Sequence, residues 1–319
     1  GIIGTGVAPL MFTKGAWAQE FCNNPTGDSV TLGFVMPLTG AYADEGADQQ
    51  RAFLLAVEHL NGEGDGGMLT TFSSKALKGN GILGKKVGYV TGDDQTKSDA
   101  GRDAARRMIE RDGAIMISGC SSSGVAVAEQ ALCQDMGVIH MSGLTHSNDT
   151  TGKDKKRYGF RHFFNAYQSG TAIAPVIGEA YGKDRRAYHL TSDYTWGWTQ
   201  EESIKNATEA MGWETVAAVR TPVGAGDFSQ YLTPVLNSGA DVLILNHYGF
   251  DGVNSLTQAV QFGMRERQAN GKDFQIVLPL VSDLMAQGAG EAIKGIYGTA
   301  NWDWKLDDAA SAAFTRSFG

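Results

Sequence analysis

Short apolar runs alternate with longer amphipathic segments along most of the chain. The apolar runs, several with β-branched residues, predict strands over residues 30–36, 85–91, 114–118, 138–142, 186–191, 215–220, 241–246, 275–280 and 295–300. Between them, apolar positions at helical spacing predict helices over 46–61, 96–111, 124–136, 168–182, 199–211, 228–238 and 252–270. Strand and helix alternate repeatedly, which indicates an α/β fold.

Such alternation is typical of right-handed βαβ crossovers and parallel sheets. Ligands of open α/β sheets bind beyond the carboxyl ends of the strands. We therefore expect functional residues in the loops that follow strands, at 37–46, 92–96, 119–124, 142–148, 192–198, 221–228, 247–252 and 281–285.

The charge balance narrows the classes of partner. The chain carries 27 Lys and Arg against 35 Asp and Glu, a formal net charge of −8, and shows no basic stripe. A nucleic-acid partner is therefore not expected.

The first residues resemble part of an export signal. A mildly apolar stretch precedes Ala16-Trp17-Ala18, an A-x-A cleavage pattern. We interpret residues 1–18 as the remnant of a signal peptide, with mature protein from Gln19. Weak hydrophobicity and Lys14 favour the twin-arginine route, so we expect a periplasmic protein.

Neither a metal nor a cofactor is predicted. The three cysteines, Cys22, Cys120 and Cys133, form no CxxC motif and no Cys/His metal spacing. No P-loop motif occurs, and two matches to G-x-G-x-x-G, at 62–67 and 79–84, lie outside the strand-to-helix context that a dinucleotide site requires.

A serine cluster lies at a predicted strand-to-helix turn, 119–124. Hydroxyl and backbone N–H groups at a helix N-terminus favour an anion such as a carboxylate. Two alternatives remain open: the serines only cap helix 124–136, or Ser121 or Ser122 works with His146 as a serine hydrolase. The turn lacks the G-x-S-x-G pattern of a nucleophile elbow.

From about residue 30 to 299 the chain resembles type I periplasmic binding proteins of the Leu/Ile/Val-binding class. Four stretches carry the resemblance, in order and spacing: GFVMPLTGAYADEG, ISGCSSSGVAVAEQALCQDMGVIHMSGLTHSND, YGFRHFFNAYQSG and the run from TSDYTWGWTQ to GADVLILN. The family implies two Rossmann-like lobes with parallel-rich sheets that close on a solute like a Venus flytrap.

The resemblance also implies an organisation and partners. One lobe would comprise 29–162 with 248–319 and the other 163–247, with hinges near 160–163 and 247–250. The protein would be a monomeric, extracytoplasmic substrate-binding component that delivers an amino acid, amide or aromatic acid to an ABC permease, and not an enzyme. A sensor of the same fold for an amide or urea-like solute is the alternative.

By the same resemblance, the solute's carboxylate would bind Ser121, Ser122, the Leu144 backbone and Thr145. Tyr194 and Trp196 would lay aromatic faces over the solute.

The sequence departs from the family where the ammonium of an amino acid would bind. No carboxylate occurs at 219–221, so Glu45, Asp193 or Asp251 is expected to replace it. Tyr42, Tyr248 and Phe250 predict a roomier or more aromatic pocket.

Some relatives have a disulfide at the position of Cys120, but no cysteine occurs near 93–95 to pair with it. We therefore expect Cys120 and Cys133 to be buried free thiols.

Overall fold

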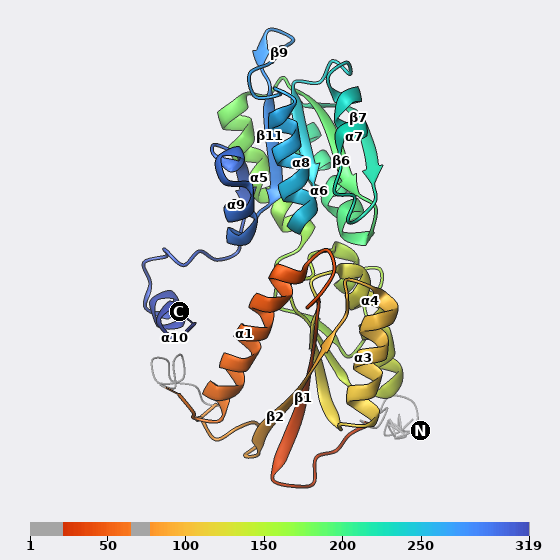
Figure 1. Cartoon of the computed structure of the whole chain (residues 1–319), viewed down its shortest axis with the longest axis vertical. Coiled ribbons are helices and arrows are strands. Elements are labelled where there is room, and N and C mark those ends of the chain that lie inside the picture. The colour runs from red at the N-terminus through yellow and green to blue at the C-terminus, as the bar shows by residue number, and fades with distance from the viewer. Residues whose placement is uncertain (1–21, 65–76, 319) are drawn as a thin grey trace, which may run out of the picture.

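The computed structural model describes residues 22–64 and 77–318, and these form two α/β lobes (Figure 1). The predicted signal remnant, 1–18, lies outside the described residues. The first lobe contains a five-stranded sheet in the order β2-β1-β3-β4-β5. Its strands are β1 (Ser29–Met36), β2 (Lys86–Asp93), β3 (Ala114–Gly119), β4 (Ile139–Ser142) and β5 (Gly159–Arg161). Every adjacent pair in this sheet is parallel.

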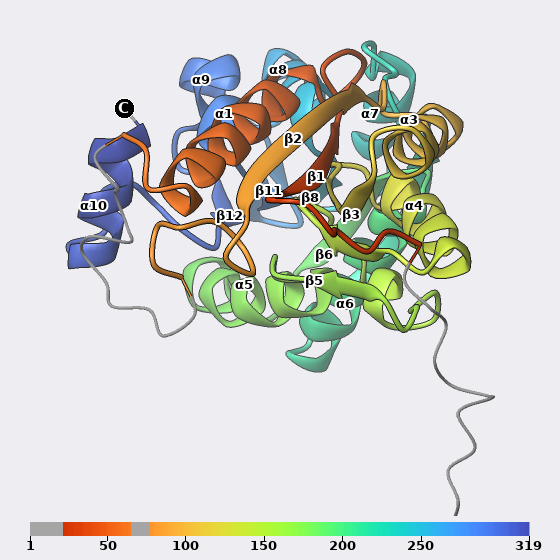
Figure 2. The same cartoon turned by 90° about the horizontal axis from the view of Figure 1, so that it is seen from below.

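Helices cover both faces of this sheet (Figure 2). They are α1 (Ala43–Leu60), α3 (Ser98–Glu110) and α4 (Ser123–Met136). Strand β1 carries Ser29 and Thr31 among its apolar residues, and its apolar side chains divide between the two faces of the sheet by the two-residue period of a strand. Val30, Leu32, Phe34 and Met36 pack with Val57 of α1, while Val35 packs with residues of α3 and α4 on the opposite face.

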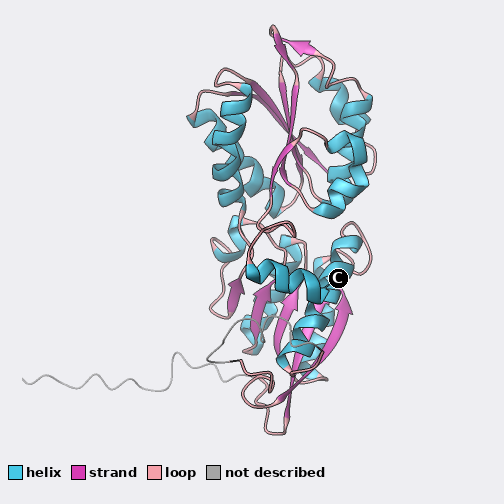
Figure 3. Ribbon diagram, turned by 90° about the vertical axis from the view of Figure 1, so that its left-hand side faces the viewer, coloured by secondary structure: helices cyan, strands magenta, loops and turns pink. Residues whose placement is uncertain are grey.

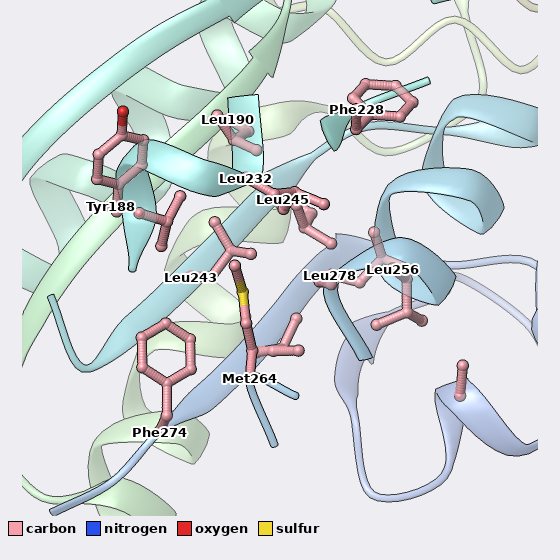
Figure 4. Packing of buried hydrophobic residues seen from close by; sticks show 14 of the residues in the cluster. Tyr188, Leu190, Phe228, Leu232, Leu243, Leu245, Leu256, Met264, Phe274 and Leu278 are labelled. Atoms are coloured by element: carbon pink, nitrogen blue, oxygen red, sulfur yellow. The ribbon is translucent and has the colours of Figure 1, made fainter. Parts of the chain in front are cut away.

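The second lobe repeats this architecture with a sheet in the order β12-β11-β8-β6-β7. The strands are β6 (Arg186–Ser192), β7 (Glu214–Thr221), β8 (Val242–Asn246), β11 (Gln275–Leu280) and β12 (Tyr297–Thr299). The helices are α5 (Ala166–Tyr181), α6 (Thr195–Ala210), α7 (Ser229–Val235), α8 (Gly249–Gln261) and α9 (Asp283–Ala289). Figure 3 shows helices on both sides of the sheet, and Figure 4 shows the core between the sheet and helices α7 and α8, in which Leu243, Leu245 and Leu256 are fully buried.

The prediction for the boundaries of the lobes was wrong for residues 248 to about 299. Strand β11 pairs with β8 in parallel, with Gln275 opposite Val242, and β12 pairs with β11. Strand β8 is buried on both faces, so it needs a hydrogen-bonded neighbour on the side away from β6, and β11 supplies it. The chain returns to the first lobe only after β12, where α10 (Ala309–Phe318) packs beside α1 (Figure 1).

Most predicted elements are confirmed, with errors of a few residues at their ends. The helix predicted to reach residue 270 instead ends at Gln261, because Gly263 adopts a positive φ of 70° and β9 (Gln268–Ala269) and β10 (Lys272–Asp273) form a short hairpin. Strand β5 and helix α9 were not predicted. Within the described ranges, no helix combines the length and hydrophobicity needed to cross a bilayer.

The close packing of α5 on α6 gives a test of the second lobe. A Cβ added at Gly170 would lie 2.7 Å from the backbone carbon of Ser203 and 2.8 Å from the backbone nitrogen of Ile204. Backbone cannot move aside as a flexible side chain can, so we expect Gly170→Ala to lower the free energy of unfolding by about 1–3 kcal/mol, despite alanine's better helix propensity. Urea unfolding measures this. Gly27→Ala is the control, because a Cβ there meets nothing within 4 Å; equal midpoints for the two variants would contradict the packing.

Candidate functional site

The carboxyl ends of the strands in both lobes point toward the junction between the lobes (Figure 1). In the first lobe, β1, β3 and β4 end at Met36, Gly119 and Ser142, and in the second lobe, β6 and β8 end at Ser192 and Asn246. The loops after these strands meet: the hydroxyl groups of Tyr42 and Tyr194 lie 2.8 Å apart across the junction. The candidate site is therefore built from loops of both lobes.

Four aromatic residues fill the centre of this junction and are called the aromatic cluster: Tyr42, Tyr194, Trp196 and Tyr248. Ring centroids are 5.9 Å apart for Tyr42 and Tyr248, 5.9 Å for Tyr194 and Trp196, and 6.2 Å for Trp196 and Tyr248. Trp196 is only 2% exposed. The tilted and edge-on ring geometry is the arrangement that aromatic quadrupoles favour.

Two hydroxyl-bearing turns of the first lobe lie side by side at this junction. The Gly143 N–H donates to the Gly119 carbonyl at 2.7 Å, and the Leu144 N–H donates to the Cys120 carbonyl at 3.1 Å. These bonds bring Ser121 and Thr145 into neighbouring turns. They also correct the prediction for Leu144, because its N–H is already used within the protein and is not available to a carboxylate.

The serines of the first turn have separate roles. Ser123 accepts hydrogen bonds from the backbone N–H groups of His146 and Ser147, at 3.1 and 3.0 Å, and so ties the two turns together. Ser122 occupies the N-cap position of α4, but its side chain makes no capping hydrogen bond. The capping alternative therefore does not account for Ser122, and its hydroxyl remains a candidate donor to an anion.

Gln49 on α1 belongs to the candidate site, although the sequence analysis did not predict it. Its Nε2 donates to the Ser121 hydroxyl at 2.6 Å, which leaves the Ser121 proton for another acceptor. A usable signal was present: Glu45 and Gln49 are polar residues four apart, so they lie on one face of α1, and both are buried.

Several buried polar atoms at the junction have no hydrogen-bond partner. They are the Thr145 hydroxyl, the Gln49 Oε1 and the Trp196 indole N–H. An unsatisfied buried polar group costs roughly 1–3 kcal/mol. Their gathering near the aromatic cluster is the pattern expected of a site that completes its hydrogen bonds with a ligand.

Two buried carboxylates flank the aromatic cluster. Glu45 is 4% exposed, and burial raises the pKa of its carboxyl to about 7. Burial likewise raises the pKa of Asp251 against hydrogen bonds from the loop 224–225, including one of 2.8 Å from the Gly224 N–H. Asp193 is exposed instead, and accepts a 2.8 Å hydrogen bond from the Trp198 indole. Phe250 is 44% exposed on the first turn of α8.

Desolvation raises the pKa values of the phenols of Tyr42, Tyr194 and Tyr248 above their ordinary range, and the charge of Glu45 acts in the same direction on all three. These phenols therefore stay neutral near pH 7. They can donate or accept hydrogen bonds without adding charge to the site.

The hydrolase alternative requires a hydrogen bond between His146 and Ser121 or Ser122, and none occurs. The ring of His146 packs against Phe164, with centroids 4.2 Å apart, and lies 6.5 Å from Trp196. Burial lowers the pKa of His146 to about 3. The hydroxyl of Ser121 bonds to Gln49, not to His146.

A polar contact joins the lobes beside the crossing segment. The hydroxyls of Ser147 and Thr195 lie 2.9 Å apart, and Thr195 also donates to Asp149 at 3.0 Å. Asn148 donates to Ser203 at 3.1 Å. The site is thus held on one side by direct hydrogen bonds between lobes.

A family model described as a periplasmic binding protein matches residues 29–319. The Leu/Ile/Val-binding protein homolog 1 of Brucella abortus is 22% identical over 322 residues, covering 98% of this chain and 74% of that protein. Homolog 7 of Brucella suis is 24% identical over 253 residues, covering 76% of this chain and 58% of that protein.

Solved structures share the fold. An R. palustris solute-binding protein in complex with 4-hydroxybenzoate aligns with a TM-score of 0.76 at 21% identity, over 91% of this chain and 73% of that one. An amino acid ABC transporter substrate-binding protein from Pseudomonas fluorescens aligns with a TM-score of 0.75 at 23% identity, over 91% and 72%.

The burial of Glu45 predicts a specific dependence of stability on pH. The unfolded carboxyl titrates near 4.5, whereas the folded one keeps its proton to about pH 7. Between these values the folded state binds more protons, so the free energy of unfolding falls as pH rises and levels off above about pH 7. Glu45→Gln should remove this decrease. The free energy of unfolding of the variant should therefore rise relative to that of the wild type, by up to about 3 kcal/mol between pH 4.5 and 7.5.

Urea unfolding at a series of pH values measures the effect. Asp44→Asn is the matched control, because Asp44 is the preceding, exposed carboxylate on α1. Parallel pH profiles for the Glu45→Gln variant and the wild type would show that Glu45 is hydrated in the folded protein.

Proposed function

The chain belongs to the periplasmic binding protein family, and on this premise we propose that it binds a small carboxylate solute between its lobes for delivery to an ABC permease. The carboxylate would lie against the two hydroxyl-bearing turns of the first lobe. The apolar or aromatic body of the solute would pack against the aromatic cluster. Family membership also implies an extracytoplasmic location and a binding role rather than catalysis.

One observation carries the proposal: the unpartnered Thr145 hydroxyl and the free donor capacity of Ser121 lie in adjacent buried turns at the lobe junction. Hydroxyl donors to a carboxylate make charge-assisted hydrogen bonds, which are shorter and stronger than neutral ones. The first helical turn of α4 adds a favourable dipole for an anion.

Contacts to both lobes would favour the closed form. The first lobe supplies Ser121, Ser122 and Thr145, while the second supplies Tyr194, Trp196 and Tyr248. A solute shifts the equilibrium toward closure only through contacts that the open form cannot make, so the second-lobe aromatics are the groups expected to drive it. The hinge would lie in the two crossing segments, 162–165 and 300–308, since these join the lobes.

The buried carboxylates and the aromatic cluster indicate which classes of solute could bind. If the solute is an amino acid, Glu45 and Asp251 are the buried candidates to meet its ammonium group. The relatives named for Leu/Ile/Val binding and the amino acid transporter protein support this class. The relative bound to 4-hydroxybenzoate supports an aromatic acid, for which the aromatic cluster provides matching faces.

We also propose that the protein is exported through the twin-arginine route and acts as a monomer. The A-x-A pattern at 16–18 supports cleavage of a leader, and the weakly hydrophobic stretch with Lys14 supports that route.

A thermal-shift screen tests the class of solute. Branched and aromatic amino acids, benzoate and hydroxybenzoates, the corresponding amides, and urea are compared, because a ligand that binds only the folded state raises the melting temperature. We expect a rise with one class of carboxylate and none with its amide. A rise with amides or urea alone would contradict the carboxylate site and favour the sensor.

Removing the two hydroxyls tests where the solute binds. For the solute found in the screen, we expect Ser121→Ala with Thr145→Val to weaken binding by at least about 100-fold, since each of the two charge-assisted hydrogen bonds is worth about 1.5–3 kcal/mol. Calorimetric titration measures the affinity. Ser118→Ala is the control, because that buried hydroxyl bonds to the Met141 carbonyl between strands. Unchanged affinity in the double variant would rule out these turns as the carboxylate site.

A further inference from the structure

Three side chains with metal-binding atoms meet inside the first lobe: Cys120, Glu129 and His140. They come from the turn after β3, from α4 and from β4, and each is fully buried. One ligand atom from each lies within 4.8 Å of the others, and His140 Nε2 is 3.1 Å from Glu129 Oε2. Their separations in the sequence, 9 and 11 residues, match no metal motif, which is why sequence analysis predicted none.

Several buried polar atoms around this group lack hydrogen-bond partners. Glu129 Oε1, His140 Nδ1 and the Oδ2 of the neighbouring Asp94 are all buried without a hydrogen bond in the described structure. A cation bound among these atoms would give them partners and would offset the cost of burying an unpaired carboxylate charge.

We propose that Cys120, Glu129 and His140 form a structural zinc site, with Asp94 as the further buried carboxylate beside it. Thiolate, imidazole and carboxylate are the three ligand types that Zn²⁺ takes. Tetrahedral bonds of about 2.0–2.3 Å hold ligand atoms roughly 3.2–3.8 Å apart, so the three atoms need only a small contraction. Their charges, with a neutral imidazole, cancel those of one divalent cation.

The backbone around the group leaves room for this arrangement. A Cβ at Gly101 of α3 would lie 2.7 Å from Glu129 Oε1 and 3.4 Å from the Asp94 Cβ. Glycine at 101 therefore leaves space for the Glu129 carboxylate beneath α3, next to the Asp94 side chain.

The site would support the solute-binding turn. Cys120 adopts a positive φ of 54°, a conformation rare for residues other than glycine, and its carbonyl receives the Leu144 N–H. A metal bond to its thiolate would fix this strained residue next to Ser121. This consequence rests on the proposed function, whereas the metal site itself does not.

Metal loading of the whole chain tests the proposal. The exposed Cys22 is replaced in every sample by Cys22→Ser, and protein without a histidine tag is loaded with ZnCl₂, desalted and analysed by mass spectrometry for metal. We expect about one zinc per chain, a higher melting temperature with zinc, and a thiolate-to-metal charge-transfer band when Co²⁺ replaces it.

Two variants distinguish the loss of a zinc ligand from the general effect of losing a buried thiol. Cys120→Ala should lose the Co²⁺ band and bind zinc at least about 100-fold more weakly. Cys133→Ala removes the other buried thiol and should keep both. If circular dichroism shows that Cys120→Ala is unfolded, His140→Gln is tested in its place, with the same loss of zinc expected.

The zinc site would be overturned if the Cys22→Ser protein retained no zinc. Equal zinc binding by the Cys120→Ala and Cys133→Ala variants would also overturn it. Cys120, Glu129 and His140 would then be a buried hydrogen-bonded group that binds no metal. These measurements use no solute, so a failed search for the solute leaves the zinc result intact. A solute that binds equally well with and without zinc would remove only the proposed support of the Ser121 turn.

Discussion

Parallel pairing of strands is the constraint on which this molecule depends. Each pair of neighbouring strands in the two five-stranded sheets runs in the same direction. The loops that leave the carboxyl ends of each sheet therefore gather at one edge, and the two edges face each other. Residues as distant in sequence as Tyr42 and Tyr248 come into ring contact for this reason.

Desolvation at the lobe junction gives the site its chemical character. Packing four aromatic rings together excludes water from Glu45 and from the hydroxyls and amides around Thr145, which raises the energy of every polar group left without a partner. Under the proposed function, a solute with complementary groups would relieve this cost only when both lobes surround it. Binding and closure would then be coupled through one set of buried atoms.

Two buried polar groups of the first lobe converge on the same turn. On one side of the 119–124 turn, Ser121 bonds to Gln49 at the lobe junction. On the other, Cys120 faces Glu129 and His140 in the lobe interior. A change in the interior group has a direct covalent path to the site, because these residues are adjacent in the chain. The unusual φ of Cys120 marks the point where the two meet.

The α/β class, most of the strands and helices, and the loops that hold the candidate site could be predicted from the sequence. Hydrophobic periodicity is a local property, and parallel strands place the loops that bind ligands at their carboxyl ends. The sequence also identified Ser121, Thr145, Tyr194 and Trp196 as residues to examine. The place of β11 in the second sheet could not be predicted, since an apolar strand such as QIVLPL fits either lobe until its hydrogen-bonded neighbour is known. Contacts between segments far apart in the chain also could not be predicted. They place the Leu144 N–H in a hydrogen bond to the Cys120 carbonyl and leave Asp193 exposed to solvent. They also bring Gln49 to Ser121, and Glu129 and His140 to Cys120.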